Sequence, residues 1–195
     1  MKYYNPILWS PILRKFQDHY NALANDIVTA RVISQSKDGH VISFREILNS
    51  RNSEMFQEFE QITGVKPWFV QIFSAGPGVV GMVHKDGIDR KCCINIPLRG
   101  CEEGINEWTL PEDGTTKLVS TEKLSIQVLS NPDQPVNIAE ATLLTVPILF
   151  RTDEWHRLDN GKNVNYRHIA SIRFVDNPAY DDVLKILTER SLCPK

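Results

Sequence analysis

Residues 68–98 read WFVQIFSAGPGVVGMVHKDGIDRKCCINIPL, and this stretch decides the fold class. It contains three short apolar runs, Trp68–Phe73, Val79–His84 and Lys91–Leu98, which are separated by glycine, proline and Asp-Gly turn residues. Runs that recur every eight to twelve residues or so, with turn residues between them, are typical of a β-sandwich or barrel. We therefore expect three strands in this stretch.

The same pattern of short apolar runs separated by turn residues continues through the rest of the chain. The further predicted strands are Asn106–Leu110, Thr116–Ser120, Leu124–Leu129, Ala141–Phe150, Glu154–Leu158 and Val164–Val175. Eight strands or so is the number expected of a jelly roll. The predicted fold is mainly β with flanking helices (α+β), arranged as a double-stranded β-helix, the cupin-like jelly roll.

Helical signals lie at the two ends of the chain. Ser10-Pro11 supplies an N-cap residue and a first-turn proline, and Ser43–Glu46 has the pattern of a capping box. Apolar residues at helical spacing in Met55–Ile62 predict another helix that ends at Gly64. Asn177-Pro178 predicts the cap and first turn of a closing helix.

The chain length of 195 residues suits a single domain, residues 1–195. Within it we expect residues 1–65 to form a helical support layer. Residues 66–176 would form the jelly-roll core, and residues 177–195 would form a C-terminal helix. A layer of helices that covers one face of a sheet is a stable way to bury both.

Charge and composition exclude several classes of protein. Lys and Arg number 22 against 24 Asp and Glu, so the chain lacks the basic excess of a general nucleic-acid binder. It has neither a run of eighteen apolar residues nor an N-terminal signal pattern. Its four cysteines form no CxxC pair, which argues against a zinc ribbon or a disulfide framework. We expect a cytoplasmic protein with reduced thiols and no membrane association.

Two of the five histidines have neighbours that suggest a metal site. His84 and Asp86 are two residues apart, so on an extended strand both side chains leave the same face. A third ligand would come from another strand, and His156 follows a long apolar run. Two His and one carboxylate form the facial triad that binds non-haem Fe(II) and leaves positions open. The alternative is structural: a turn at Asp86-Gly87, and a hydrogen-bonded His156.

A hairpin signal connects the predicted strand of His156 to the strand that follows it. Asn160-Gly161 predicts a two-residue turn, which would place Arg167 diagonally opposite His156, about 7 Å away on the same face. An arginine there could bind the far carboxylate of a metal-chelating dicarboxylate. Counting on by twos adds three residues to this face: Ile169, Ser171 and Arg173. A three-residue turn would instead present Tyr166, His168 and Ala170.

A lone polar residue, Asn95, interrupts the apolar run Lys91–Leu98. A buried Asn needs hydrogen-bond partners, and a bound ligand could supply them. The alternative is that Asn95 satisfies a bulge or the backbone beside Pro97.

These residues together resemble a known family, the Fe(II)- and 2-oxoglutarate-dependent oxygenases. Within it, the aspartyl/asparaginyl β-hydroxylase-like branch is the most similar. The resemblance covers roughly residues 66 to 176 and depends on the order HxD, H, R. It is carried by His84-Lys85-Asp86-Gly87, Asn95-Ile96-Pro97-Leu98, Trp155-His156-Arg157-Leu158-Asp159-Asn160, Arg167 and Ser171-Ile172-Arg173-Phe174.

The resemblance implies a role for each of these residues. His84, Asp86 and His156 would bind Fe(II), and Arg167 would bind the distal carboxylate of 2-oxoglutarate. Arg173 is a second candidate for that contact, because the Arg167-to-Arg173 spacing is similar to the paired arginines of the alkylated-nucleic-acid repair dioxygenases. The remaining predicted cosubstrate contacts are Asn95 and Ser171.

The implied reaction consumes 2-oxoglutarate and O₂, releases succinate and CO₂, and hydroxylates or demethylates a substrate. Residues 66–176 would be the catalytic part. The expected substrate is a small molecule or a protein side chain, and the net charge disfavours nucleic acid. The alternative function is a cupin-like binding module in which the same residues hold Zn²⁺ or no metal. A third is an interaction domain whose helical half binds a partner.

Overall fold

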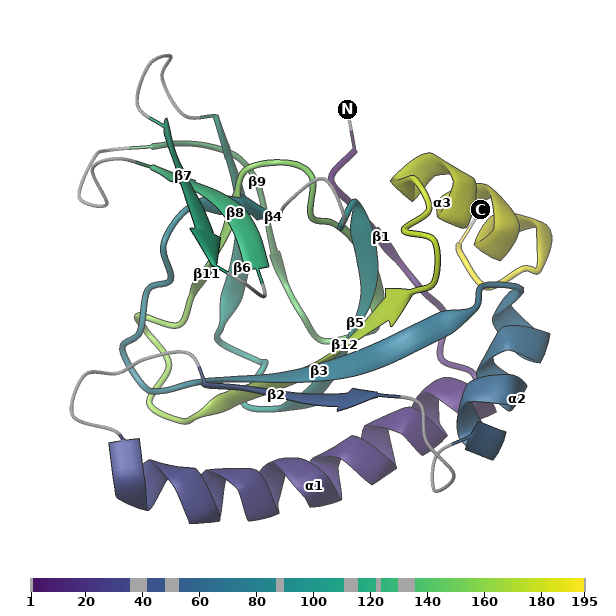
Figure 1. Cartoon of the computed structure of the whole chain (residues 1–195), viewed down its shortest axis with the longest axis horizontal. Coiled ribbons are helices and arrows are strands. Elements are labelled where there is room, and N and C mark those ends of the chain that lie inside the picture. Colours follow the sequence, from purple (N-terminus) through teal and green to yellow (C-terminus); the bar gives the residue numbers. More distant parts are fainter. Residues whose placement is uncertain are drawn as a thin grey trace.

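In the part of the chain that the computed structural model describes, twelve strands form two antiparallel sheets of six, and three helices pack against one of them (Figure 1). The structure describes residues 2–35, 42–47, 53–86, 90–110, 116–121, 124–129 and 136–194. This arrangement is the predicted jelly roll with flanking helices.

The first sheet is the one against which the helices pack. Its strands, in spatial order, are β1 (Tyr4–Pro6), β10 (Ile148–Arg151), β5 (Cys92–Arg99), β12 (Arg167–Phe174), β3 (Pro67–Ala75) and β2 (Ile42–Ile47). Alternate residues of the central strand β12 face opposite sides. Ala170, Ile172 and Phe174 are buried against the helices, so the odd-numbered residues face the other sheet.

Three helices cover the outer face of this sheet: α1 (Pro11–Gln35), α2 (Ser53–Thr63) and α3 (Tyr180–Glu189). The Ser10 hydroxyl accepts a hydrogen bond from the Leu13 amide, as its predicted N-cap role requires. Gly64 ends α2 with φ of +73°, a conformation that favours glycine. The main apolar core lies between these helices and the sheet.

Two helix predictions are wrong in detail. Residues 42–47, which include the capping-box pattern Ser43–Glu46, form strand β2 and pair with β3 along its open edge. The exposed hydrogen-bonding groups of that edge outweigh the local capping pattern. Asn177 does not cap α3, because Ala179 holds the N-cap position and the Asn177 side chain accepts a hydrogen bond from the Lys91 amide.

The second sheet faces the first across the interior. Its strands, in spatial order, are β7 (Thr116–Thr121), β8 (Leu124–Leu129), β4 (His84–Asp86), β11 (His156–Asp159), β6 (Ile105–Leu110) and β9 (Asn137–Leu143). A small apolar cluster that includes Trp108 and Phe150 fills part of the space between the sheets. The rest of that space is a pocket.

Two predicted strands differ from the structure. The run Ala141–Phe150 is divided between β9 and β10, because the chain crosses from one sheet to the other and Pro147 has no N–H to donate to a ladder. The run Val79–His84 contributes only an isolated bridge at Val80 before β4 begins at His84. Gly81 interrupts it and approaches the Leu158 backbone closely.

The predicted hairpin at Asn160-Gly161 is also wrong. Strand β11 pairs with β4 and β6, whereas β12 pairs with β3 and β5, so the two strands belong to different sheets. Asn160 is fully buried, and its side-chain amide donates to the Gly76 carbonyl at 2.7 Å. Its side chain stabilises the loop between β11 and β12, where the chain passes from one sheet to the other. Asn160-Gly161 is therefore not the turn of a hairpin.

Asn160→Ala is therefore expected to destabilise the fold by about 2 kcal/mol, because the loop carbonyls that it binds lose their donor. Urea denaturation should show a lower midpoint with an unchanged slope. Asn137→Ala, the same change at an exposed position of β9, is the control and should alter stability by less than about 0.5 kcal/mol. Equal effects of the two substitutions would contradict the stabilising role of the Asn160 side chain.

Across the described part of the chain, no helix has the length and apolar character needed to span a membrane.

Candidate metal centre and ligand pocket

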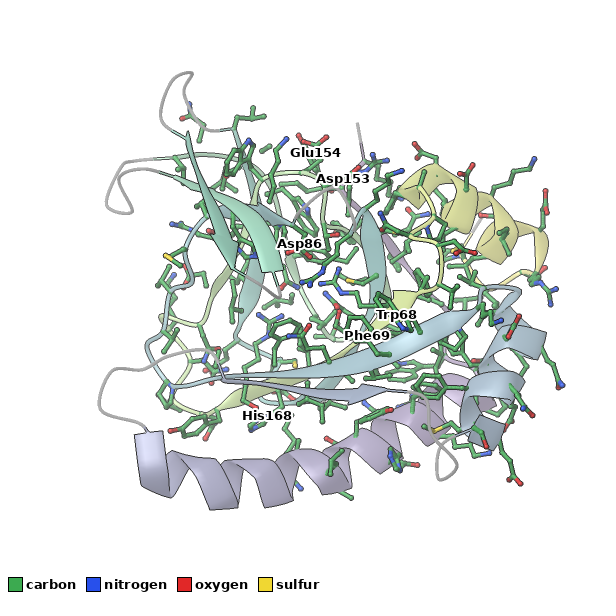
Figure 2. All side chains as sticks on the ribbon, viewed as in Figure 1. Trp68, Phe69, Asp86, Asp153, Glu154 and His168 are labelled. Atoms are coloured by element: carbon green, nitrogen blue, oxygen red, sulfur yellow. The ribbon has the colours of Figure 1, made fainter. Side chains whose placement is uncertain are left out.

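Three side chains of metal-ligand type meet between the sheets. His84 and Asp86 lie on β4, where their two-residue spacing puts both on the inner face, as the sequence predicts. His156 on β11 is the direct cross-strand partner of His84. One ligand atom from each of the three residues lies within 4.8 Å of the others. Figure 2 shows Asp86 in the space between the two sheets.

Both imidazoles are oriented by backbone carbonyls. His84 Nδ1 lies 2.9 Å from the Met82 oxygen, and His156 Nδ1 lies 2.7 Å from the Glu154 oxygen. A carbonyl can only accept a hydrogen bond, so each Nδ1 carries a proton, and in the neutral imidazole Nε2 is then the nitrogen with the lone pair. This is the arrangement in which histidine binds a metal through Nε2.

His156 is held in the neutral form. Burial, followed by the nearby His84, lowers its pKa to about 3. A neutral imidazole is the form that donates to a metal ion. The His156 ring therefore needs no deprotonation at neutral pH before it can bind one.

Asp86 is paired with an arginine from the opposite sheet. Burial alone would raise the pKa of Asp86, but Arg173, followed by His156 and His84, lowers it below its ordinary value. The Arg173 Nη2 lies 2.9 Å from Asp86 Oδ2, and both side chains are 8% exposed. Asp86 Oδ1 points toward His84 Nε2, 3.8 Å away. One carboxylate oxygen thus contacts Arg173 and the other faces His84.

A pocket of about 330 Å³ extends from these three residues along the inner face of β12. That volume is in the range of small-molecule sites. Four residues of β12 line it in order from the end nearest the histidines: Arg173, Ser171, Ile169 and Arg167. The face assignment of these four residues agrees with the prediction, although the hairpin on which it was based does not exist. Figure 2 shows His168, which the alternative turn would have placed inside, on the α1 side of the sheet.

A polar row crosses the middle of the pocket floor. Ser171 on β12 is paired with Asn95 on β5 and with Gln71 on β3, and all three line the pocket. Neither the buried Ser171 hydroxyl nor the buried Gln71 Oε1 has a hydrogen-bond partner in the part of the chain that the structure describes. Asn95 Oδ1 accepts a hydrogen bond from the Cys93 thiol. The floor therefore offers polar groups that a bound ligand could satisfy.

Arg167 closes the far end of the pocket and is almost fully buried, at 2% exposure. Its Nη2 donates to Asn106 Oδ1 at 2.9 Å, whereas its Nε and Nη1 have no hydrogen-bond partner among the residues that the structure describes. Within the described ranges, no carboxylate pairs with it. The adjacent Cys101 is a neutral thiol, because burial raises its pKa. A buried guanidinium without an anion is unfavourable, and a ligand carboxylate would compensate it.

Gly104 packs directly on this arginine. A Cβ added at Gly104 would lie 2.5 Å from Arg167 Cδ and 2.8 Å from Asn160 Oδ1. Because such contacts force a side chain to move, only glycine leaves Arg167 in its observed position.

Gly104→Ala is expected to cost about 1–3 kcal/mol of folding free energy through overpacking, and to displace the Arg167 guanidinium. Gly76→Ala is the matched control, because a Cβ there meets Tyr166 and Val79 at an ordinary 3.6 Å. Chemical denaturation of both variants measures the difference. If Gly104→Ala is no less stable than Gly76→Ala, Arg167 is not fixed by this contact.

Asn106 and Gln71 are among the pocket residues that were not predicted from the sequence. Gln71 is a lone polar residue in the apolar run Trp68–Phe73, which is the same signal that singled out Asn95. Asn106 begins the predicted strand Asn106–Leu110, but its contact with Arg167 joins opposite sheets and leaves no local pattern in the sequence.

No family model and no curated protein matches the chain. Among solved structures, it is similar to AviO1 from Streptomyces viridochromogenes Tue57, with 15% identity over 91% of both chains and a TM-score of 0.46. It is similar to EvdMO1, with 14% identity over 90% of this chain and 48% of that one and a TM-score of 0.47. A Pseudomonas putida prolyl-4-hydroxylase matches at 11% identity over 82% and 88% of the two chains, with a TM-score of 0.39. All three TM-scores are below 0.5.

Proposed function

We propose that the protein is an Fe(II)- and 2-oxoglutarate-dependent dioxygenase. The observation that carries the proposal is the pairing of two features in one pocket. Two histidine side chains and one carboxylate converge at one end, and at the other lies a buried arginine that no carboxylate of the described residues pairs with. A dicarboxylate that chelates a metal through its 2-oxo acid end and meets Arg167 through its far carboxylate satisfies both.

The donor set fits Fe(II). Two imidazoles and one carboxylate, with further positions left open, are the ligands of non-haem Fe(II) oxygenases. In His84 and His156 the Nδ1 atoms are already bonded to carbonyls, which leaves only Nε2 to bind a metal. When bound, the iron supplies the activation of O₂ that accompanies conversion of 2-oxoglutarate to succinate and CO₂.

The two pocket arginines would have different roles. Arg173 is paired with Asp86, so it would keep that carboxylate ionised and orient it toward the histidines. Arg167 would bind the distal carboxylate of 2-oxoglutarate, because its Nε and Nη1 lack hydrogen-bond partners within the described ranges. Ser171 and Asn95 would contact the cosubstrate between these ends.

The pocket walls would shield the reacting groups from water. Phe150 packs edge-on against His156, with ring centroids 5.1 Å apart, and Ile169 covers the floor beside Ser171. The remaining space near His84 would admit a small molecule or a protein side chain, which we propose as the substrate to be hydroxylated or demethylated. Asp86 supplies a carboxylate ligand, which favours these reactions over halogenation.

The test is turnover of 2-oxoglutarate in air by the full chain loaded with Fe(II). Dioxygenases of this type form succinate slowly even without their substrate, so we expect one succinate and one CO₂ for each 2-oxoglutarate consumed. Zn²⁺-loaded protein is the control and should form none. If Fe(II) binds at the site but no succinate appears, the protein is a metal-holding binding module instead.

A further inference from the structure

The pocket opens between two pairs of apolar side chains, one from each sheet. Phe73 on β3 and Ile169 on β12 are cross-strand partners in the first sheet. On the facing side, Leu158 lies on β11 and Met82 lies just before β4, where the Gly81 amide donates to the Leu158 carbonyl at 2.7 Å. All four residues line the pocket and are at least partly exposed. Phe73, Met82, Leu158 and Ile169 thus form an apolar rim around the mouth of the pocket.

Packing of the core does not account for most of this apolar rim. Phe73, Met82 and Leu158 contribute to neither of the two apolar clusters that the described residues form. Met82 is 61% exposed, and Val80, two residues before it, is 50% exposed. Apolar side chains left open to solvent beside a pocket are typical of ligand-binding sites. A methionine suits this position, because its unbranched side chain adapts to the shape of an apolar ligand.

The charged groups of the pocket already have partners. Apart from the histidines, the charged side chains of the described residues that line it are Asp86, Arg90, Arg157, Arg167 and Arg173. Arg173 pairs with Asp86 at 2.9 Å, and Arg90 lies near the same carboxylate. Arg157 Nε donates to Glu107 Oε2 at 2.6 Å, and Arg167 would bind the cosubstrate. A charged substrate group would therefore lose its hydration here without gaining a counter-charge of its own.

The extent of the apolar rim suits a small molecule rather than a protein surface. A stable protein interface covers about 800 Å² on each partner. Among the described apolar side chains that line the pocket, Met82 alone is largely exposed, so the rim offers much less than that. The volume of about 330 Å³ would also have to hold the cosubstrate, which leaves room for only a small part of the substrate.

We infer that the substrate is an uncharged small molecule, and that it presents an aliphatic or aromatic group to the metal end of the pocket through the apolar rim. This assignment rests on the proposed function. Hydroxylation would place one atom of O₂ in a C–H bond of this group. The other atom would enter succinate as the C1–C2 bond of 2-oxoglutarate breaks and CO₂ leaves. The four electrons that O₂ accepts come in equal parts from the C–H bond and from 2-oxoglutarate.

The test compares three probes that share a cyclohexane ring and differ in charge: cyclohexanecarboxamide, cyclohexanecarboxylate and cyclohexylmethylammonium. Each is titrated calorimetrically into full-length protein that is saturated with Mn(II) and 2-oxoglutarate. The uncharged amide should bind at least about tenfold more tightly than either charged probe, because each charge loses hydration at the apolar rim without gaining a new partner.

Met82→Lys places a cation on the apolar rim at an exposed position, where the fold should tolerate it. The preference for the amide over the carboxylate should fall about fivefold, because the variant loses apolar contact and gains a counter-charge. The preference for the amide over the ammonium probe should not fall, and Met82→Leu should keep both preferences. Ile138→Lys is the matched control, the same charge change at a 50% exposed position of β9, and should behave as the wild type does.

Tighter binding of a charged probe, binding of none of the three, or equal effects of Met82→Lys and Ile138→Lys would overturn the inference and leave the proposed function standing. If the capped peptide acetyl-Ala-Ala-Leu-Ala-Ala-amide binds more tightly than cyclohexanecarboxamide, the rim receives a protein side chain and the small-molecule substrate is wrong. Protein that binds Mn(II) but not 2-oxoglutarate would contradict the proposed function itself, and this failure appears before any probe is added.

Discussion

Replacing His84 by alanine is expected to lower the affinity for Fe(II) more than about 100-fold and to abolish succinate formation. Removing even an outer contact of a metal site typically costs tenfold to 100-fold in affinity, and His84 would be one of only three protein ligands. The Nδ1 atom, not Nε2, is the one that binds the Met82 carbonyl, and Nε2 lies 3.8 Å from Asp86 Oδ1. Titration of the metal-free protein with Fe(II) under anaerobic conditions measures the loss.

The control for this change is His19→Ala. His19 lies exposed on α1, on the opposite side of the first sheet from the pocket, and its loss should leave Fe(II) affinity unaltered. Should His84→Ala and His19→Ala bind Fe(II) equally well, the three residues His84, Asp86 and His156 do not hold the metal.

Arg167→Ala is expected to raise the Kd for 2-oxoglutarate at least about 30-fold in the Mn(II)-loaded protein. Removing one partner of a buried, hydrogen-bonded charge pair costs about 2–5 kcal/mol. The affinity for Mn(II) itself should remain unchanged, because among the described residues Arg167 makes no contact with His84, Asp86 or His156. Calorimetric titration with metal first and cosubstrate second separates the two quantities.

Arg173→Ala should produce the opposite pattern. Without Arg173, the pKa of Asp86 rises because burial is no longer offset, and a protonated carboxyl is a poor metal ligand. Metal affinity should fall about tenfold to 100-fold. Equal losses of 2-oxoglutarate affinity in the two variants, at saturating metal, would contradict the division of roles between the arginines.

The sequence predicts the parts of this site that depend on strand periodicity. His84 and Asp86 share a face because they are two residues apart, and the same rule groups Arg167 with Ser171 and Arg173. This grouping is correct even though the predicted hairpin at Asn160 is wrong. The side chains of β12 alternate between the two faces of the sheet whichever strand lies beside it.

Contacts between the two sheets are the part that the sequence does not predict. The Asp86–Arg173 ion pair and the Arg167–Asn106 hydrogen bond each join residues more than sixty positions apart, on different sheets. Local patterns carry no information about such pairs. The same limit explains the capping-box pattern at Ser43–Glu46, where pairing with β3 outweighs the local helical signal.

The central claim is that one metal ion and one dicarboxylate occupy this pocket together. A crystal structure of the protein with Mn(II) and 2-oxoglutarate, with the metal located by anomalous scattering, tests it most directly. We predict one ion bonded to His84 Nε2, His156 Nε2 and an Asp86 oxygen, with the far carboxylate of 2-oxoglutarate bound to Arg167. An ion bound elsewhere, or a dicarboxylate that does not reach Arg167, would contradict it.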